Sequence, residues 1–269
     1  MYQRILVPVD GSRFSEQILP HVRWISGKTG VAVALLRVVD KDSERAQAQS
    51  ALEALGAGVP ATSICVASGG DVARAILDEA ARVPGTLVAM TSHGRSGVMQ
   101  AILGSTASKV LRTGREPIFV FRPPQADASS GAAPIERIVV PLDGSALSES
   151  ILSPAAALAR WIGARVVVVS VLDPAAREAD PGVPSSDVME SNYVRSHATK
   201  LSGRDGLEIG WEVLHGDPKE AISSFVRSLP NTMLAMTTHG RSALQSALVG
   251  SVTAASLRDG GVPVFTRLA

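Results

Sequence analysis

Short apolar runs alternate with amphipathic segments along the chain. Residues 5–9 are rich in β-branched side chains, as strands are, and the apolar residues of 15–25 recur at helical spacing after a turn at Asp10-Gly11-Ser12. Residues 31–39 form a continuous apolar run, as expected for a strand covered on both faces. Further strands are predicted over residues 62–67, 86–90 and 117–121, and further helices over 43–55, 72–81 and 105–112. This order predicts a doubly wound, Rossmann-like α/β domain with a five-stranded parallel sheet.

The second half of the chain repeats the first half. The motif RILVPVDGS of residues 4–12 returns as RIVVPLDGS at residues 137–145, an offset of 133 residues. Three later motifs, Gly-Asp, His-Gly-Arg-Ser and Gly-Ser, return at an offset of 146, so the second copy has 13 extra residues between Asp173 and Asp217. Residues 123–134 are rich in Pro, Ala, Ser and Gly and form a predicted linker. We therefore expect two such domains, residues 1–122 and 135–269.

Charge and composition exclude several classes of protein. The 26 Lys and Arg residues balance 25 Asp and Glu residues, so the net charge of +1 gives no overall basic field for nucleic acid or an acidic membrane. The single cysteine, Cys65, cannot form an internal disulfide or a CxxC zinc site. The apolar runs are far shorter than the roughly 18 residues that cross a bilayer, and the N-terminal residues lack signal-peptide features. We expect a cytoplasmic globular protein with no nucleic-acid partner, no membrane partner and no structural metal.

The carboxyl ends of the predicted strands carry the candidate ligand site. In doubly wound sheets, ligands bind outside these ends, where the order of the strands reverses. Glycines at a strand-to-helix junction let backbone amides approach phosphate oxygens, and the N-terminus of the following helix favours an anion. Gly94 and Gly104 hold such positions before the helix predicted from Ser105, and Gly240 and Gly250 hold them in the second copy. These junctions predict an anion site in each domain.

Both copies resemble the universal stress protein family in its tandem two-domain form. The nucleotide loop of that family has the pattern Gly, two residues, Gly, nine residues, Gly and then Ser or Thr. Gly94 and Gly240 are each followed by nine residues and then Gly-Ser, whereas Thr91 and Thr237 replace the first glycine of the pattern. The resemblance implies an adenine nucleotide alpha hydrolase-like fold. It also implies a stress-response protein that binds ATP, with or without Mg²⁺, and acts on a protein partner as a nucleotide-dependent regulator.

The resemblance further implies which residues contact the nucleotide. The aspartate that ends the first strand in the family matches Asp10 and Asp143, and the adenine-packing position matches Val38 and Val171. The implied set in the first copy is Pro8, Val9, Asp10, Val38, Met90, Thr91, Gly94, Arg95, Gly104, Ser105 and Thr106. The implied set in the second copy is Pro141, Leu142, Asp143, Val171, Met236, Thr237, Gly240, Arg241, Gly250, Ser251 and Val252.

Each of these residue types also has an ordinary structural explanation. An aspartate before glycine alternatively starts a turn, a serine at a helix start is an N-cap, a valine in a strand is core packing, and an arginine in a loop is a solvated side chain. His93 and His239 have no second histidine or cysteine at metal-ligand spacing, so we expect them to be structural. Cys65, in a predicted strand, is expected to be core packing rather than a reactive thiol.

Three functions remain open from the sequence. A nucleotide-dependent regulator requires only binding. Neither copy has a clustered general base, a metal-ligand set or an activated nucleophile, so no catalytic residue is predicted and any ATP hydrolysis would be slow. An ATP-using enzyme would need residues that bind an acceptor, and the extra segment around residues 186–200 is the one place for them. A scaffold with empty sites would follow if Thr91 and Thr237 abolished binding.

The last strand of each domain predicts how the protein assembles. Residues 117–121 and 263–266 are largely apolar and would lie at sheet edges, and exposed apolar edges tend to pair. The resemblance implies dimerisation through this strand. We therefore expect a pseudo-dimer of the two domains within the chain, with a homodimer of full chains as a further candidate.

Overall fold

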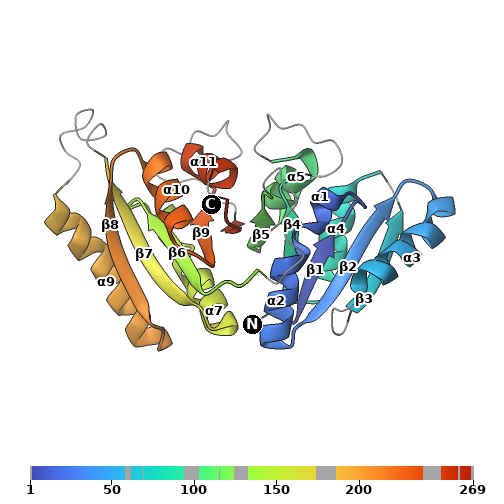
Figure 1. Cartoon of the computed structure of the whole chain (residues 1–269), viewed down its shortest axis with the longest axis horizontal. Coiled ribbons are helices and arrows are strands. Elements are labelled where there is room, and N and C mark those ends of the chain that lie inside the picture. Colours follow the sequence, from blue (N-terminus) through green and yellow to red (C-terminus); the bar gives the residue numbers. More distant parts are fainter. Residues whose placement is uncertain are drawn as a thin grey trace. The chain divides into compact units, whose positions relative to one another are not determined.

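The computed structural model describes residues 2–57, 62–68, 70–93, 103–114, 116–123, 133–173, 186–238, 250–259 and 261–267. The chain divides into two compact units, Met1–Pro134 and Ile135–Ala269 (Figure 1). Each unit combines helices with a parallel sheet, as the alternation of apolar runs predicts. None of the described helices is long and apolar enough to cross a membrane.

Unit 1 is a doubly wound α/β domain. Its elements are β1 (Arg4–Pro8), α1 (Arg13–Glu16), α2 (Leu19–Thr29), β2 (Ala32–Val39), η1 (Asp42–Glu44), α3 (Arg45–Gly56), β3 (Thr62–Ser68), α4 (Val72–Ala81), β4 (Thr86–Thr91), α5 (Ser105–Thr113) and β5 (Ile118–Phe121). The strands pair in parallel in the order β3-β2-β1-β4-β5. The chain adds strands on one side of β1 and then on the other. Right-handed crossovers therefore place α2 and α3 on one face of the sheet and α4 and α5 on the opposite face.

Unit 2 repeats this arrangement with one longer helix. Its elements are β6 (Arg137–Leu142), α6 (Ala146–Glu149), α7 (Leu152–Ile162), β7 (Arg165–Leu172), α9 (Asp187–Asp205), β8 (Ile209–His215), α10 (Pro218–Ser228), β9 (Thr232–Thr237), α11 (Ser251–Asp259) and β10 (Val264–Arg267). The strands pair in parallel in the order β8-β7-β6-β9-β10. Helix α9 has 19 residues, against 12 in α3.

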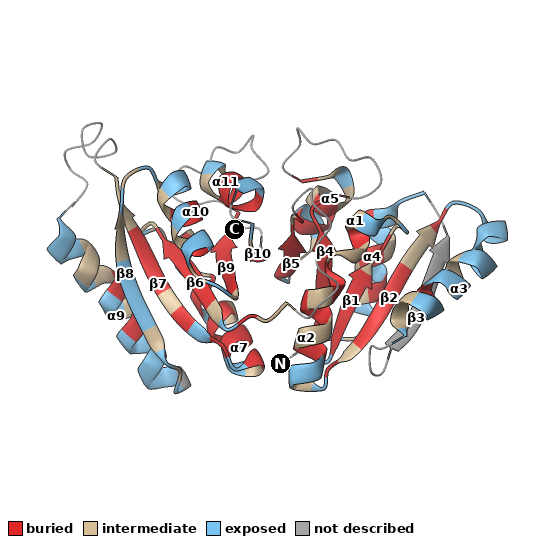
Figure 2. Cartoon of the chain, viewed as in Figure 1, coloured by how far each residue is buried: buried red, intermediate tan, exposed pale blue. Residues whose placement is uncertain are grey.

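The core of each unit lies on the central strand and its two neighbours. Ile5, Leu6 and Val7 on β1 are fully buried, as are the β6 residues 138–140 at the repeated positions. Figure 2 shows the buried colour running along β1 and β4 in unit 1 and along β6 and β9 in unit 2. Burial on both faces removes the polar alternation of a half-exposed strand. This explains why these strands read as continuous apolar runs.

The first predicted helix differs from the observed structure. Residues 15–25 were expected to form one helix, but the chain forms α1 and then α2, with a break at Gln17 and Ile18. Pro20 is in the first turn of α2, where its missing N–H breaks no helical hydrogen bond. Gly30, with a φ of 70°, ends α2 in the left-handed conformation that glycine adopts without strain. The polar turn from Asp10 to Ser12, between β1 and α1, lies at the carboxyl end of β1.

Candidate functional site

Each unit has a cavity at the carboxyl ends of its central strands. In unit 1, the cavity has a volume of about 310 Å³ and lies among the ends of β1, β2 and β4 and the first turns of α4 and α5. In unit 2, a cavity of about 340 Å³ lies among the equivalent ends of β6, β7 and β9, the first turns of α10 and α11, and α9. Both volumes are at the lower end of the range of small-molecule sites. The cavities lie where the order of the strands reverses.

The structure gathers the described members of the expected site around these cavities. The unit 1 cavity is lined by Pro8, Val9, Asp10, Val38, Met90, Thr91, Gly104, Ser105 and Thr106. The unit 2 cavity is lined by Pro141, Leu142, Asp143, Val171, Met236, Thr237, Gly250, Ser251 and Val252. Gly94, Arg95, Gly240 and Arg241 lie outside the described residues.

The aspartate at the end of the first strand has a structural role as well as a place in the cavity. In unit 1, Asp10 Oδ1 accepts hydrogen bonds from the backbone N–H of Ser12 at 2.9 Å and from its hydroxyl at 2.6 Å. In unit 2, Asp143 Oδ1 accepts the same pair from Ser145 at 3.0 and 2.6 Å. These contacts form an Asx turn, so the alternative of an Asp-Gly turn is correct. The turn also fixes the orientation of each carboxylate at the cavity wall.

The threonine that replaces the first glycine of the family pattern leaves the cavity in place. The side chain of Thr91 is buried, and its hydroxyl donates a hydrogen bond of 2.7 Å to the carbonyl oxygen of His93. The Thr91 hydroxyl therefore stabilises the start of the loop that leaves β4. The cavities of 310 and 340 Å³ exist with Thr91 and Thr237 in their walls.

A hydrogen bond joins the two ends of this loop in each unit. The backbone N–H of Gly104 donates to the carbonyl oxygen of Ser92 at 2.7 Å, and that of Gly250 donates to the carbonyl oxygen of Thr238 at 2.6 Å. A Cβ on Gly104 would lie 3.1 Å from the same Ser92 oxygen, which is a tight contact with backbone. Glycine at position 104 therefore favours this close approach through its missing Cβ, and not through its φ of −65°, which is ordinary.

Helix α5 directs its first turn at the cavity. Gly104 is the N-cap of α5 and Ser105 is its first helical residue, so the alternative that Ser105 is the N-cap is wrong. The backbone N–H groups of the first turn have no partner within a helix, and the helix dipole makes this end positive. Ser105, Thr106 and Ala107 from this turn line the cavity. The arrangement can bind an anionic group such as a phosphate.

A cation lies beside the unit 1 cavity. The guanidinium of Arg37, on β2, occupies the space where a Cβ on Gly11 would be. Gly11 directly follows the cavity residue Asp10, and its φ of 76° also favours glycine. The Arg37 side chain therefore covers the turn that ends β1.

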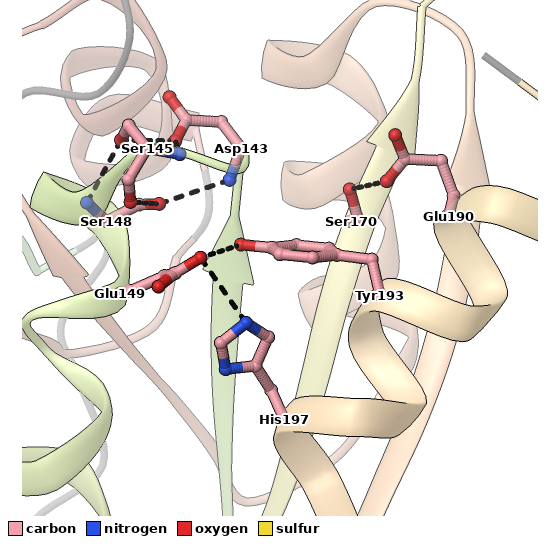
Figure 3. A network of polar contacts seen from close by, with 8 residues as sticks. All are labelled: Asp143, Ser145, Ser148, Glu149, Ser170, Glu190, Tyr193 and His197. Carbon is pink, nitrogen blue, oxygen red and sulfur yellow. Dashed lines mark hydrogen bonds and ion pairs between the residues drawn. The ribbon is translucent and has the colours of Figure 1, made fainter. Parts of the chain in front are cut away.

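Unit 2 has a carboxylate in the corresponding region. Glu190, from the first turn of α9, lines the unit 2 cavity, and its Oε2 accepts a hydrogen bond of 2.7 Å from the hydroxyl of Ser170 on β7 (Figure 3). Asp173, just after β7, lines the same cavity. Together with Asp143, these residues give the unit 2 cavity three carboxylates.

A cluster of polar side chains holds α9 against α6. Figure 3 shows Tyr193 and His197, both from α9, pointing at the carboxylate of Glu149 on α6. The Tyr193 hydroxyl donates to Glu149 Oε1 at 2.9 Å, and His197 Nε2 lies 3.3 Å from the same oxygen. Burial, with help from the neighbouring Glu149 carboxylate, raises the pKa of Tyr193 above its ordinary value. Because Glu190, Tyr193 and His197 are three and four residues apart, they share one face of α9, and this cluster positions Glu190.

Several cavity residues were not predicted from the sequence. The additional lining residues are Ser15, Leu36, Val72, Ile76, Ser92, His93 and Ala107 in unit 1 and Ser148, Ser170, Asp173, Glu190, Pro218, Ile222, Thr238 and Thr253 in unit 2. Ser15 and Ser148 follow the two DGS motifs at the same spacing, so the repeat itself could have identified them. Glu190 matches Glu44 at the offset of the later motifs, but Glu44 does not line the unit 1 cavity, so the repeat does not identify Glu190.

Among the described residues, no group of three or more His, Cys, Asp and Glu side chains could hold a metal ion. The carboxylates of the unit 2 cavity therefore do not form a metal centre within the described part of the chain. A helix N-terminus beside an apolar wall is the feature that both cavities share.

Comparisons with known proteins agree with this architecture. A universal stress protein of Methanocaldococcus jannaschii is 26% identical over 136 residues, which cover 48% of this chain and 80% of that protein. A solved universal stress protein from Archaeoglobus fulgidus has a TM-score of 0.68 at 22% identity, covering 100% of this chain and 99% of that one. A functionally unknown protein from Pseudomonas aeruginosa has a TM-score of 0.67 at 18% identity, covering 99% of this chain and 92% of that one. These two structures share the fold.

The family assignment comes from the sequence of both units. A model of the universal stress protein family matches residues 1–57, 40–122 and 134–266, which is nearly the whole chain. The matched ranges contain the repeated strands, the Asx turns and the loops that end at Gly104 and Gly250. This chain therefore belongs to the universal stress protein family, and it carries two copies of the family's domain.

Proposed function

We propose that this protein binds adenine nucleotides in the carboxyl-end cavity of one or both units and acts as a nucleotide-dependent regulator. The main support for the proposal is that separate segments of the chain meet at one cavity in each unit. Segments that are far apart in the sequence, at the ends of β1, β2 and β4 and at the start of α5, line one cavity in unit 1, and the equivalent segments line one in unit 2. A packing role alone would not require an open cavity at the same place in both copies.

The chemistry of the walls fits the parts of a nucleotide. Val38 and Met90 supply apolar surface for the base in unit 1, and Asp10 supplies a carboxylate that can accept hydrogen bonds from a base or a ribose. The first turn of α5 supplies backbone N–H groups for a phosphate. The described residues offer no cage for a metal ion, so any Mg²⁺ would enter bound to the phosphates of the nucleotide, as it commonly does.

The proposal requires no catalytic step. Regulation would follow from a difference between the nucleotide-bound and free forms that a protein partner recognises. A cytoplasmic location and assembly through the edge strands of the units, as the sequence leads us to expect, belong to the same proposal.

The test combines nucleotide release with titration. Protein purified without added ligand is denatured and the released nucleotides are separated, and native protein is then titrated with ATP in a calorimeter. We expect released adenine nucleotide or a dissociation constant in the micromolar range. The double variant Val38→Trp/Val171→Trp, which fills both cavities, should weaken binding more than tenfold.

The control places the same residue outside the cavities. Val188→Trp adds the same bulk at a position on α9 that is 69% exposed, so it should bind ATP as the parent does. Circular dichroism and thermal unfolding establish that all variants fold. If the parent releases no nucleotide and ignores ATP, the proposal is wrong and the alternative of a scaffold holds.

A further inference from the structure

We infer that the two cavities prefer different members of the adenine series. In this inference, the unit 1 cavity takes ATP, whereas the unit 2 cavity takes adenosine in preference to its phosphates, and Glu190 sets that preference. The inference rests on the proposed function, because it assumes that both cavities take an adenine ligand. It adds a specificity-determining residue from α9, which is longer than its counterpart α3 in unit 1.

The nucleotide loops cannot produce the difference, because their charges are equal. Residues 93–106, HGRSGVMQAILGST, contain one arginine, and residues 239–252, HGRSALQSALVGSV, also contain one. Neither segment contains a lysine, an aspartate or a glutamate. The charge difference between the two cavities must therefore come from the other residues around them.

The second strand of each unit supplies the first difference. Pro8 pairs with Leu36 in unit 1, and Pro141 pairs with Val169 in unit 2, so Arg37 and Ser170 hold the same position in the two sheets. Arg37 places a positive charge against the turn that ends β1. Ser170 is neutral, and its hydroxyl donates to the Glu190 carboxylate.

The cavity walls supply the second difference. Among the described lining residues, neither cavity has a lysine or an arginine, but the unit 1 cavity has one carboxylate, Asp10, whereas the unit 2 cavity has three, Asp143, Asp173 and Glu190. Carboxylates that line the same cavity lie close to any ligand in it, and physiological salt screens charges weakly at separations below the Debye length of about 8 Å. A phosphate in this cavity would therefore feel the carboxylates with little screening by salt.

Glu190 cannot easily turn away from an anionic ligand. Its Oε2 is bound by Ser170, and the contacts of Tyr193 and His197 with Glu149 hold the same face of α9 against α6 (Figure 3). Ser170 directly precedes Val171, which lines the wall that we assign to the base. The carboxylate can accept hydrogen bonds from the hydroxyls or the amino group of adenosine. Glu190 thus favours the nucleoside and opposes each added phosphate.

The experiment isolates one cavity at a time in the full chain. Val38→Trp leaves the unit 2 cavity, Val171→Trp leaves the unit 1 cavity, and each variant is titrated with adenosine, AMP, ADP and ATP at physiological salt. We expect Val38→Trp protein to bind adenosine at least tenfold more tightly than ATP. Val171→Trp protein should show the opposite order by at least tenfold.

Substitution of the carboxylate then tests the role of Glu190. Glu190→Gln in the Val38→Trp background keeps the size of the side chain and removes its charge, so the preference for adenosine over ATP should fall at least fivefold. Glu212→Gln removes the same charge from an exposed position on β8 and should leave the preference unchanged. It therefore controls for a change in overall charge.

The outcomes separate this inference from the proposed function. If both cavities bind ATP more tightly than adenosine, or if Glu190→Gln leaves the preference of unit 2 unchanged, the inference is overturned while the proposed function stands. If Val38→Trp protein binds none of the four compounds, both the inference and the proposed function of unit 2 fall.

Discussion

The arginine that begins the first strand has different surroundings in the two units. In unit 1, Arg4 is buried, and its guanidinium contacts Glu79 Oε1 at 2.9 Å, the Glu79 carbonyl oxygen at 2.6 Å and Thr86 Oγ1 at 3.2 Å. In unit 2, the repeated Arg137 is more exposed and donates to the Pro230 carbonyl oxygen at 3.3 Å. The same residue at the same place in the repeat is thus buried in one unit and half-buried in the other.

This difference shows that duplication has conserved the backbone more closely than the polar contacts. A buried charge is strongly destabilising when its partner is removed, whereas an exposed one is worth little. A similar difference exists beside the two cavities, where the same strand position holds the charged Arg37 in unit 1 and the neutral Ser170 in unit 2. The units should therefore respond differently to matched substitutions.

The largest effect is expected at the Arg4–Glu79 pair. Glu79→Ala leaves the Arg4 guanidinium buried without its carboxylate, so unit 1 should lose about 3–5 kcal/mol of stability. Arg137→Ala in unit 2 should cost less than about 1 kcal/mol. Hydrogen exchange followed by mass spectrometry reads the two units separately through peptides from β1 and β6. Equal losses of protection in the two variants would contradict the comparison.

A pH-dependent effect should also be confined to unit 1. His21 is buried against Phe119 and Phe121, and its Nδ1–H donates to the Ala133 carbonyl oxygen at 3.2 Å. Burial lowers the pKa of His21 from 6.5 to about 4, because the charged form is poorly solvated there, and the hydrogen bond to Ala133 opposes this only in part.

The sign follows from the two pKa values. The unfolded chain takes up the proton first, so the contribution of His21 is complete above pH 6.5 and is lost as the pH falls to about 4, by about 3 kcal/mol. Denaturant unfolding of the parent and of His21→Phe at pH 7 and pH 4.5 measures this change in the free energy of unfolding. His21→Phe should lose less stability between these pH values. The repeated position in unit 2 is Pro154, which cannot titrate.

The turn beside Arg37 should be more sensitive than an open glycine turn. Gly11→Ala would introduce strain at a φ of 76° and would displace the end of the Arg37 side chain from its place over the turn, at a cost of about 1–3 kcal/mol. Gly30→Ala has similar strain at a φ of 70° but open space around it, so it should cost less. Thermal unfolding compares the two. Adding Arg37→Ser to Gly11→Ala should recover part of the loss, and no recovery would argue against this displacement.

The smallest effect is expected in the cluster that holds α9. Tyr193→Phe removes the hydrogen bond to Glu149 and keeps the ring, so unit 2 should lose about 1 kcal/mol. Exchange in β6 and α9 peptides should rise, and exchange in β1 peptides should stay the same. A change of equal size in unit 1 would show that the effect is not local to this cluster.

The sequence predicted the parts of the fold and site that depend on repeated local patterns. The strands, the Asx turn at Asp10 and the start of α5 follow from apolar runs, turn residues and glycines that both copies share. The break between α1 and α2 was missed because Ile18, at the break, continues the helical spacing of apolar residues. Glu190 was missed because its role depends on how α9 packs, which no local pattern of the chain encodes.

The hydrogen bond from the Gly104 N–H to the Ser92 carbonyl oxygen, at 2.7 Å, has a consequence for protein engineering. It joins the end of β4 to the start of α5, so residues 93–103 form a cassette whose two attachment points are already held together. For a flexible segment, the entropy of closure rises only slowly with length. Segments of other lengths could therefore be exchanged into this position while the sheet and α5 keep their places. Residues 239–249 could be exchanged in the same way, because the Gly250 N–H and the Thr238 carbonyl oxygen form the matching hydrogen bond of 2.6 Å.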